Sequence, residues 1–510
     1  MNEQDDNSMA VFIVQKFRLR PTWKVLCRFS YTTNYRRIDL AKSGLGCGGI
    51  NIPSHGGSLC LLPTPGIQNS ETAMASNNLS PTSSILIIGA GTWGYSTALH
   101  LARRGYTNVK VLDPHPVPSP IAAGNDINKI MEHKELKVEY RCSKHCFCTR
   151  AALVGWTTDP VFMPYFHDTG FIIAGHTPAL IQHIQEGEID QSRGDFEFLE
   201  SAGDFHRTMP PGILTSEFPG WKGWMSRTGA GWIHAIKAMV SAYKEAQRLG
   251  VSFLTGPFQG NVKSLVYEGG DVIGALTQDG TTHYAQQTIL TAGAGSDQLL
   301  DFKKQLRPTA WTLSHIQMTP EEAQKYHNLP VMFNIAKGFF IEPDEDKHEL
   351  KICDEHPGYC NFVMDPDHQG EMRSVPFAKT QIPLEAEGRA REFLRDTMPH
   401  LADRPFSFAR ICWDTDTIDR AFLINRHPDY ASLVVAVGGS RNGAMQMPTI
   451  GGFIADALEG KLQKELKDVF KWRPEIAVNR DWWSTQNRFG RPDRLMDFQD
   501  LKDDDWTNIA

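Results

Sequence analysis

The sequence lacks three features that would place it in other classes of protein. No uncharged apolar run approaches the roughly 20 residues of a membrane-spanning helix, so no membrane partner is expected. The formal charge is -7 and the body of the chain has no basic stripe, which argues against nucleic acid as a partner. The nine cysteines are odd in number and scattered. They suit a reducing compartment better than a disulfide framework.

The N-terminal segment differs in composition from the rest of the chain. Residues 1–82 are rich in Ser, Asn, Gly and Pro and have no sustained apolar periodicity, which predicts a disordered or mispredicted N-terminal extension. The basic residues of this segment stand nearly free of acids, so an organellar transit peptide is an alternative. We expect a cytoplasmic protein, with the peroxisome and the mitochondrion as alternatives. The C-terminus carries no peroxisomal tripeptide.

A strand, a glycine loop, a helix and a second strand follow Pro81. Residues 85–88 are apolar, 95–104 have helical character, and 109–112 predict a strand that ends at Asp113. Gly89, Gly91 and Gly94 fit a loop that permits a tight turn, approach of a pyrophosphate, and close packing of the helix. The helix N-terminus stabilises the phosphate charge, and Asp113 is placed to accept hydrogen bonds from ribose hydroxyls. This pattern predicts dinucleotide binding.

The chain after Asp113 gives weaker signals for the type of cofactor and for secondary structure. FAD and NAD both fit the glycine loop, although residues 288–295, a strand ending in small residues after a meander, favour FAD. We expect a helix over 232–248, a strand at 251–254 and a meander over 262–295. Further strands are expected at 338–341, 350–355 and 433–437. Residues 476–510 are charged and aromatic and predict a C-terminal arm.

Several segments together resemble a known family of flavoenzymes. Residues 84–113, which include Gly-Ala-Gly-Thr-Trp-Gly, resemble fungal fructosyl amino acid oxidase, or amadoriase, of the sarcosine oxidase and D-amino acid oxidase superfamily. The resemblance covers 83–507 with one gap, and it is also carried by 123–129, 167–170, 229–232, 306–311, 351–359 and 408–413.

This resemblance implies an α/β (α+β) fold with a Rossmann-type FAD-binding domain interleaved with a mixed-sheet substrate domain. The FAD-binding domain is expected to comprise 83–130, 225–300 and 405–475, and the substrate domain 151–224 and 301–404. The implied reaction oxidises a secondary amine to an imine and reduces dioxygen to hydrogen peroxide. The partners are therefore a small-molecule amine and dioxygen, and we expect a monomer.

The resemblance also implies roles for individual residues. Lys351 and Glu355 stand four apart in a predicted strand, so both face the same side. Lys351 is expected to assist dioxygen reduction and Glu355 to contact the sugar of the substrate, whereas the residues alone allow an exposed charge pair of little effect. Lys129 is expected at the flavin face as a further catalytic residue. Arg488 is expected to clamp the substrate carboxylate, with a surface arginine as the alternative.

Cofactor contacts are implied in the same way. Cys412 matches the cysteine that is joined through sulfur to the flavin, although a small buried thiol is the alternative. The expected FAD-binding residues are Gly89, Gly91, Thr92, Trp93, Gly94, Asp113, Lys129, Cys412, Gly443 and Met445.

Two positions and one segment depart from the family. Met445 replaces a lysine that reaches substrate or flavin, and Asn425 replaces an aspartate, so the usual Amadori substrate is open to question. Residues 131–150 have no counterpart in the family and contain three close cysteines, Cys142, Cys146 and Cys148. A second ligand pair for zinc is missing, so no metal is expected, and the segment reads as a divergent loop or an unremoved intron.

Three functions remain open from the sequence. The leading hypothesis is an FAD-dependent oxidase of a fructosyl amino acid or a similar N-alkyl amino acid. A pipecolate-, saccharopine- or sarcosine-type oxidase, or an amine oxidase of secondary metabolism, is the second. An inactive flavin-binding protein that acts through its N-terminal extension is the third, and the retained Lys351 and Cys412 argue against it.

Overall fold

The structure is a computed structural model that describes residues 79–132, 143–189, 194–366, 368–489 and 494–508. Internal contacts divide the chain into two units, Met1–Met74 and Ala75–Ala510. All described residues belong to the second unit. The predictions for residues 1–78, and for Cys142, lie outside the described residues.

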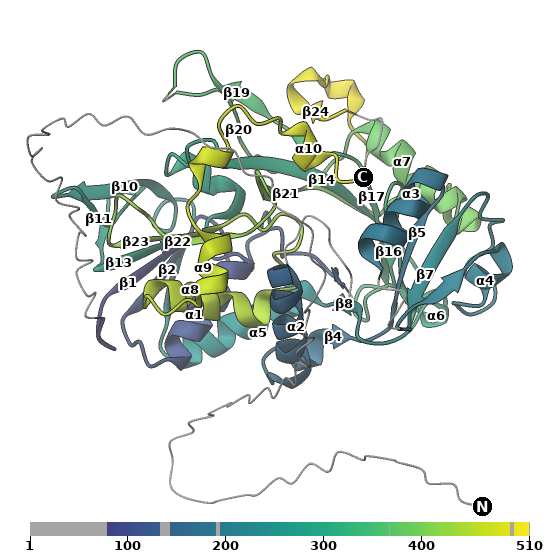
Figure 1. Ribbon diagram of the computed structural model, residues 1–510, viewed down its shortest axis with the longest axis horizontal. Coiled ribbons are helices and arrows are strands. Elements are labelled where there is room, and N and C mark those ends of the chain that lie inside the picture. Colours follow the sequence, from purple (N-terminus) through teal and green to yellow (C-terminus); the bar gives the residue numbers. More distant parts are fainter. Residues whose placement is uncertain (1–78, 133–142, 190–193, 367, 490–493, 509–510) are drawn as a thin grey trace, which may run out of the picture. The chain divides into compact units, whose positions relative to one another are not determined.

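A parallel sheet forms the first layer of this unit (Figure 1). Its first strand is apolar at every position because both faces of the sheet are covered, as is usual for parallel sheets. The strand order is β22-β23-β13-β1-β2-β9, with only β22 antiparallel. The strands are β1 (Ile85–Ile88), β2 (Val109–Asp113), β9 (Ser252–Thr255), β13 (Gln287–Leu290), β22 (Leu423–Arg426) and β23 (Leu433–Val437).

Helices cover one face of this sheet and a small antiparallel sheet covers the other. Alternate residues point to opposite faces, so Ile85 and Ile87 pack against the helices, whereas Leu86 and Ile88 pack toward the small sheet. The helices are α1 (Thr92–Arg103), α5 (Ala235–Arg248) and α8 (Met447–Leu458), and the small sheet contains β10 (Val262–Glu268), β11 (Asp271–Thr277) and β12 (Thr282–Tyr284).

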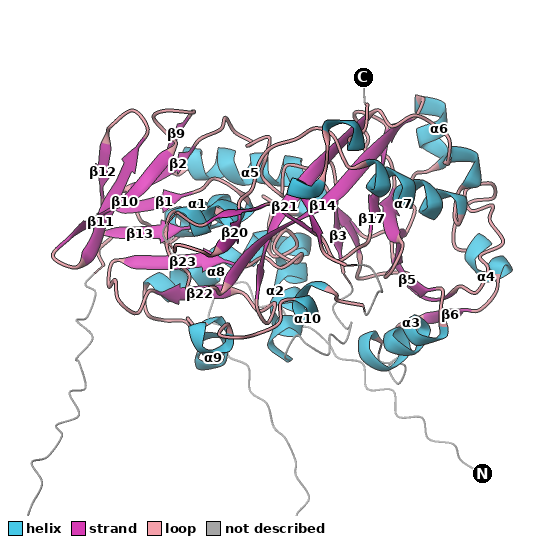
Figure 2. Cartoon of the chain, turned by 90° about the horizontal axis from the view of Figure 1, so that it is seen from above, coloured by secondary structure: helices cyan, strands magenta, loops and turns pink. Residues whose placement is uncertain are grey.

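A ten-stranded mixed sheet lies beside the parallel sheet in both views (Figures 1 and 2). Its two longest strands, β14 and β21, pair along their length in antiparallel register. The strands are β5 (Phe171–Gly175), β6 (Glu197–Leu199), β7 (Lys222–Ser226), β14 (Leu306–Gln317), β15 (Val331–Asn334), β16 (Gly338–Ile341), β17 (Glu349–Asp354), β18 (Tyr359–Cys360), β21 (Phe408–Thr417) and β24 (Met496–Asp497).

Shorter elements complete the described chain. Strand β8 pairs with both β3 and β4, and β19 pairs with β20. These strands are β3 (Lys129–Met131), β4 (Phe166–His167), β8 (Gly231–Ile233), β19 (Phe362–Met364) and β20 (Met372–Ser374). The remaining helices are α2 (Ser143–Thr158), α3 (Pro178–His183), α4 (Ala202–His206), α6 (Pro320–Lys325), α7 (Leu384–Arg395), α9 (Lys464–Phe470) and α10 (Trp483–Gln486).

Two predicted element boundaries are wrong. Trp232 belongs to strand β8, and helix α5 begins at Ala235, because Gly231 and Ile233 pair with neighbouring strands before the helical periodicity starts. Strand β17 ends at Asp354, one residue before Glu355. The predicted division into interleaved domains stays a prediction, since contacts group Ala75–Ala510 into one compact unit.

The C-terminal segment packs on the ten-stranded sheet. Strand β24 pairs in parallel with β18, and the side chains of Phe498 and Trp506 share a core cluster with Ile411 and Trp413 of β21. The tail therefore stabilises the strand that carries Cys412.

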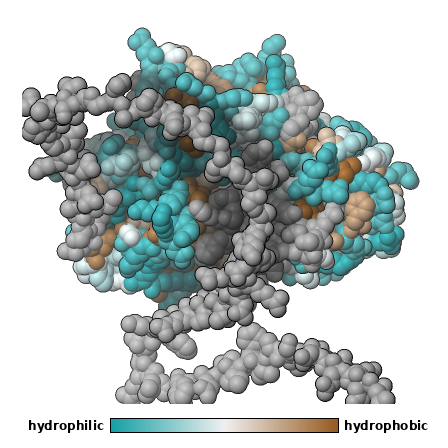
Figure 3. Space-filling model, in the orientation of Figure 1, coloured by the Kyte–Doolittle hydropathy of each residue, from teal (hydrophilic) through white to brown (hydrophobic). Residues whose placement is uncertain are grey.

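The described residues that are visible on one face of the molecule are mainly polar. Hydrophilic side chains cover most of the face in Figure 3, and hydrophobic ones form small patches. Within the described residues, every helix is too short or too polar to cross a membrane.

Candidate active site

The glycine loop connects β1 to α1 at the carboxyl edge of the parallel sheet. Gly89 has a φ of +102°, and a Cβ there would come within 2.7 Å of the Ala292 backbone. A Cβ at Gly94 would lie 1.9 Å from the carbonyl oxygen of Gly89, so the helix approaches the loop only because Gly94 lacks a side chain. A Cβ at Gly91 would meet no described atom within 4 Å. The loop backbone is therefore open to a ligand at Gly91.

The carboxylate of Asp113 closes the loop at the end of β2. Its Oδ2 accepts a hydrogen bond from the amide of Ala90 at 2.8 Å, and its Oδ1 accepts one from the amide of His115 at 2.9 Å. Burial raises the pKa of this carboxyl, and the two amides lower it in part. Each oxygen keeps a lone pair, which suits acceptance from ribose hydroxyls.

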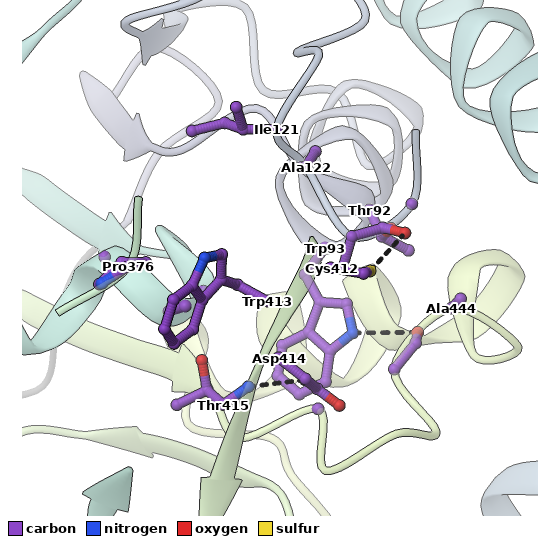
Figure 4. A pocket seen from close by; sticks show the side chains of 18 of the residues that line it. Thr92, Trp93, Ile121, Ala122, Pro376, Cys412, Trp413, Asp414, Thr415 and Ala444 are labelled. Carbon is purple, nitrogen blue, oxygen red and sulfur yellow. Dashed lines mark hydrogen bonds between the residues drawn. The ribbon is translucent and has the colours of Figure 1, made fainter. Parts of the chain in front are cut away.

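A cavity of about 540 Å³ begins at this loop and extends to the ten-stranded sheet. Figure 4 shows Thr92 and Trp93 at the start of α1, Cys412 to Thr415 of β21 and Ala444 of the β23–α8 loop around it. Of the predicted site residues, the cavity is lined by Gly89, Gly91, Thr92, Trp93, Asp113, Lys129, Lys351, Glu355, Cys412, Gly443 and Met445. Among the described residues, Gly94 and Arg488 are the two predicted ones that lie behind this lining.

Alternation along β17 brings Lys351 to the cavity. Leu350 and Ile352 point into a hydrophobic core cluster, whereas Lys351 and Cys353 line the cavity on the opposite face. Glu355 continues this face just beyond the strand. Lys351 is 1% exposed and Glu355 3% exposed, so the alternative of an exposed charge pair is wrong.

Lys351 belongs to a buried cluster of three charges. Its Nζ donates to Asp126 Oδ2 and, at 2.8 Å, to the carbonyl oxygen of Asn128. The same carboxylate oxygen lies 2.9 Å from the Nζ of Lys129. Burial would raise the pKa of Asp126, but the neighbouring positive charges, led by Lys129 and Lys351, hold it below its usual value. Asp126 thus balances one of two lysine charges and leaves a net positive site beside the cavity.

Lys129 also lies near Cys412. The Nζ of Lys129 is 3.8 Å from the Sγ of Cys412, so an ammonium group lies beside this sulfur. Burial would lower the pKa of Lys129, but Asp126 and Cys412 raise it. The thiol of Cys353 also lines the cavity, and burial raises its pKa to about 12. Of these two cysteines, Cys412 is therefore the better candidate for a reactive thiolate.

A second charged pair lines the cavity. Arg441 donates from both terminal nitrogens to the two oxygens of Glu355, at 2.7 and 2.6 Å. The Arg441 guanidinium also lies about 6 Å from the ring centroids of Trp311, Phe333 and Phe489. Sequence reasoning missed both Arg441 and Asp126. Asp126 lies within the run 123–129 that carries the family resemblance, whereas nothing in the sequence singles out Arg441.

Arg488 forms an ion pair with a buried aspartate, and its predicted role as a substrate clamp stays a prediction. Its guanidinium pairs with the buried Asp416, donates to the carbonyl oxygen of Ser440 at 3.3 Å, and lies 4.9 Å from the Trp311 ring. Burial lowers the pKa of Arg488 to about 9, and Asp416 offsets only part of that effect. The alternative of a surface arginine is wrong, because Arg488 is 7% exposed.

The two departures from the family lie in different places. Met445 is buried in the cavity wall, and its carbonyl oxygen accepts a hydrogen bond from the Trp156 indole at 2.7 Å. Asn425 lies in the edge strand β22, opposite Val435, and outside the cavity lining of the described residues. Only Met445 can therefore act directly on a ligand. Of the three close cysteines, Cys148 is buried in the hydrophobic core.

Known proteins resemble this chain in sequence and in structure. A family model described as DAO, FAD dependent oxidoreductase, matches residues 84–457. The chain belongs to this family. The crystal structure of amadoriase I from Aspergillus fumigatus is 71% identical with a TM-score of 0.83, and the match covers 86% of this chain and 100% of that one.

Two further relatives extend the comparison. Amadoriase II from Aspergillus fumigatus is 52% identical with a TM-score of 0.78, over 85% of this chain and 98% of that one. L-saccharopine oxidase from Schizosaccharomyces pombe is 28% identical over 417 residues, covering 78% of this chain and 95% of the relative. The predicted fold and the predicted FAD-dependent oxidation of a secondary amine are confirmed.

The residues of the cavity fit FAD. The open backbone at Gly91, the N-terminus of α1 and the Asp113 carboxylate suit the diphosphate and ribose of a dinucleotide. Lys351, Lys129 and Cys412 line the same cavity and suit the reactive end of a flavin.

Proposed function

We propose that the protein oxidises fructosyl amino acids or closely similar N-alkyl amino acids. One observation carries the proposal: a single cavity joins the glycine loop to Lys351, Cys412 and the Glu355–Arg441 pair. The amadoriases compared above support the substrate class. When bound, FAD accepts two electrons from the amine and passes them to dioxygen.

Lys351 acts on dioxygen in this proposal. Its ammonium is held by Asp126 and the Asn128 carbonyl, so it costs little reorganisation when negative charge develops on the oxygen. The second ammonium, on Lys129, raises the local positive potential. Asp126 acts as a positioning residue because it fixes both ammonium groups.

Arg441 and Glu355 select the substrate. A substrate carboxylate can replace Glu355 on the two N–H donors of Arg441, because both anions match the guanidinium fork. The released Glu355 then accepts hydrogen bonds from sugar hydroxyls or the substrate ammonium. Arg441 thereby supplies the positive charge that Met445 cannot. Arg488 remains a predicted carboxylate clamp, although Asp416 now balances its charge.

Cys412 attaches the flavin covalently in this proposal. Cys412 would hold the flavin through a carbon–sulfur bond to a methyl group of its ring, and this bond would replace one C–H bond and one S–H bond. Dioxygen accepts the two electrons. The Lys129 ammonium lies 3.8 Å from this sulfur, where a positive charge can assist its reaction.

We further propose that the protein is a monomer and that it lies in the cytoplasm.

A second candidate is a saccharopine-type oxidase. Met445 in place of lysine and the similarity to L-saccharopine oxidase favour it. A peroxide-release assay with a fructosyl amino acid, saccharopine, sarcosine and pipecolate separates the candidates. We expect the highest kcat/KM with the fructosyl amino acid. Preference for saccharopine would select the second candidate, and no peroxide from any amine despite bound flavin would select the inactive flavoprotein.

A further inference from the structure

A second cavity, of about 820 Å³, runs along helix α5 from its N-terminal end and shares no described lining residue with the flavin cavity. His234, Asp344 and Asp346 line it, and one ligand atom from each lies within 4.8 Å of the other two. His234 follows strand β8 directly, and the two aspartates lie in the turn between β16 and β17. The turn thus brings two carboxylates to the histidine.

The imidazole of His234 packs near the Trp232 ring but makes no hydrogen bond to any described residue. It is 4% exposed, and neither ring nitrogen has a hydrogen-bond partner within the part of the chain that the structure describes. Buried polar atoms are nearly always partnered, and two orphan nitrogens on one ring cost stability. A metal ion is the ligand that a buried imidazole beside two carboxylates most readily accepts.

The carboxylate of Asp344 is already oriented for such a role. It is 2% exposed and accepts hydrogen bonds from the backbone amides of Asp346, Lys347 and Glu349, at 3.3, 3.0 and 3.2 Å. Hydrogen bonds of this kind fix the direction of a ligating carboxylate. Asp344 and His234 therefore form the rigid half of the site.

Asp346 forms the movable half. Its side chain is 63% exposed, and its Oδ2 lies 2.8 Å from the Nζ of Lys237, which is 33% exposed. Ligand atoms around tetrahedral zinc are about 3.3 Å apart, and the exposed Asp346 side chain can turn inward to reach that spacing. Lys237 and the positive end of α5 oppose a cation, but Lys237 can swing into solvent and the two carboxylates carry the larger charge.

We propose that His234, Asp344 and Asp346 bind a divalent cation of the zinc type. The site offers one nitrogen and two oxygen donors and leaves a fourth position to water, which matches zinc or manganese chemistry. The bound ion would join helix α5 to the turn that precedes β17, the strand that carries Lys351.

Calorimetric titration of the FAD-loaded protein with zinc chloride tests the proposal. Asp346→Asn, at an exposed position where folding is not at risk, is expected to weaken zinc binding at least about tenfold, since even indirect partners of a metal change affinity by that factor. Lys237→Met is expected to tighten binding about threefold, because it removes a competing charge. His234→Gln is expected to abolish the same binding event.

Glu345→Gln is the matched control, because Glu345 is an exposed carboxylate between the two aspartates in sequence and belongs to no ligand group. Its zinc affinity is expected to equal that of the wild type. Equal zinc affinity in the wild type and in the Asp346→Asn and His234→Gln variants would overturn the proposal. A Lys237→Met variant that binds zinc no more tightly would also count against it.

Discussion

The two ends of the flavin cavity are built from different materials. At the glycine loop the wall is backbone, and three glycines leave the space that the turn, the helix and a ligand need. Near the ten-stranded sheet the wall is side chain, and charged residues in it include Lys129, Lys351, Asp354, Glu355, Asp414 and Arg441, with Asp126 behind the two lysines. A substitution at the glycine loop changes the space left for the helix and the ligand. A substitution near the ten-stranded sheet changes the charge of the cavity wall. We therefore expect substitutions at the loop to impair folding or flavin binding, and substitutions at the charged end to impair catalysis or substrate binding.

The largest effect is expected at the loop. Gly94→Ala places a Cβ against the Gly89 carbonyl, so the helix must move, at a cost of about 1–3 kcal/mol, and flavin content should be lost. Gly91→Ala is the matched control for folding, because a Cβ there points into open space. It should keep the apoprotein Tm and weaken only flavin binding. Flavin absorbance and Tm, measured together, check both, and a Gly94→Ala protein with full flavin content would contradict this account.

At the charged end, the Lys351→Met variant should still bind flavin. Its reduced flavin should react with dioxygen about 100-fold more slowly or slower still, as expected when a preorganised charge is removed. Stopped-flow mixing of the reduced enzyme with dioxygen measures this step alone. Lys222→Met, which removes an exposed lysine paired with Glu200, serves as the control. Unchanged reoxidation in Lys351→Met would remove the lysine from the mechanism.

Cys412→Ser tests the link between the two ends. Acid precipitation should release all the flavin from this variant and none from the wild type, because serine cannot form the thioether. Cys353→Ser is the control, since that thiol also lines the cavity and burial raises its pKa to about 12. Release of flavin from the wild type would show that the flavin is not covalently attached.

Arg441→Gln should raise KM for a fructosyl amino acid by about 10- to 100-fold with little change in kcat, the range for losing a charge-assisted hydrogen bond. Arg227→Gln is the matched control, because its pair with Glu197 is exposed. A fall in kcat without a change in KM would instead assign Arg441 to the chemical step.

The smallest effect is expected for Met445→Lys. A lysine at this position of the cavity wall restores one hydrogen-bond donor, so kcat/KM should shift toward fructosyl substrates by about fivefold. The ratio of kcat/KM for a fructosyl amino acid to that for saccharopine measures the shift. An unchanged ratio would mean that residue 445 does not contact the substrate.

The backbone loop depends on residues close together in the sequence, whereas the charged end depends on residues far apart. This difference explains which parts the sequence could predict. The strand, loop, helix and strand over 85–113 depend on local spacing, so their positions agree with the structure to within a few residues. The Arg441–Glu355 and Lys351–Asp126 pairs join residues that are 86 and 225 positions apart, and local patterns hold no information on such contacts. The helix expected over 232–248 failed in part because Trp232 fits both a strand and a helix, and pairing with β3 and β4 decides between them.

Anaerobic reduction of the bound flavin tests most directly whether one cavity unites flavin and amine oxidation. A fructosyl amino acid is expected to bleach the flavin absorbance without dioxygen, and aeration is expected to restore it with one equivalent of hydrogen peroxide. A flavin-loaded protein that stays yellow with every secondary amine tested would contradict this expectation.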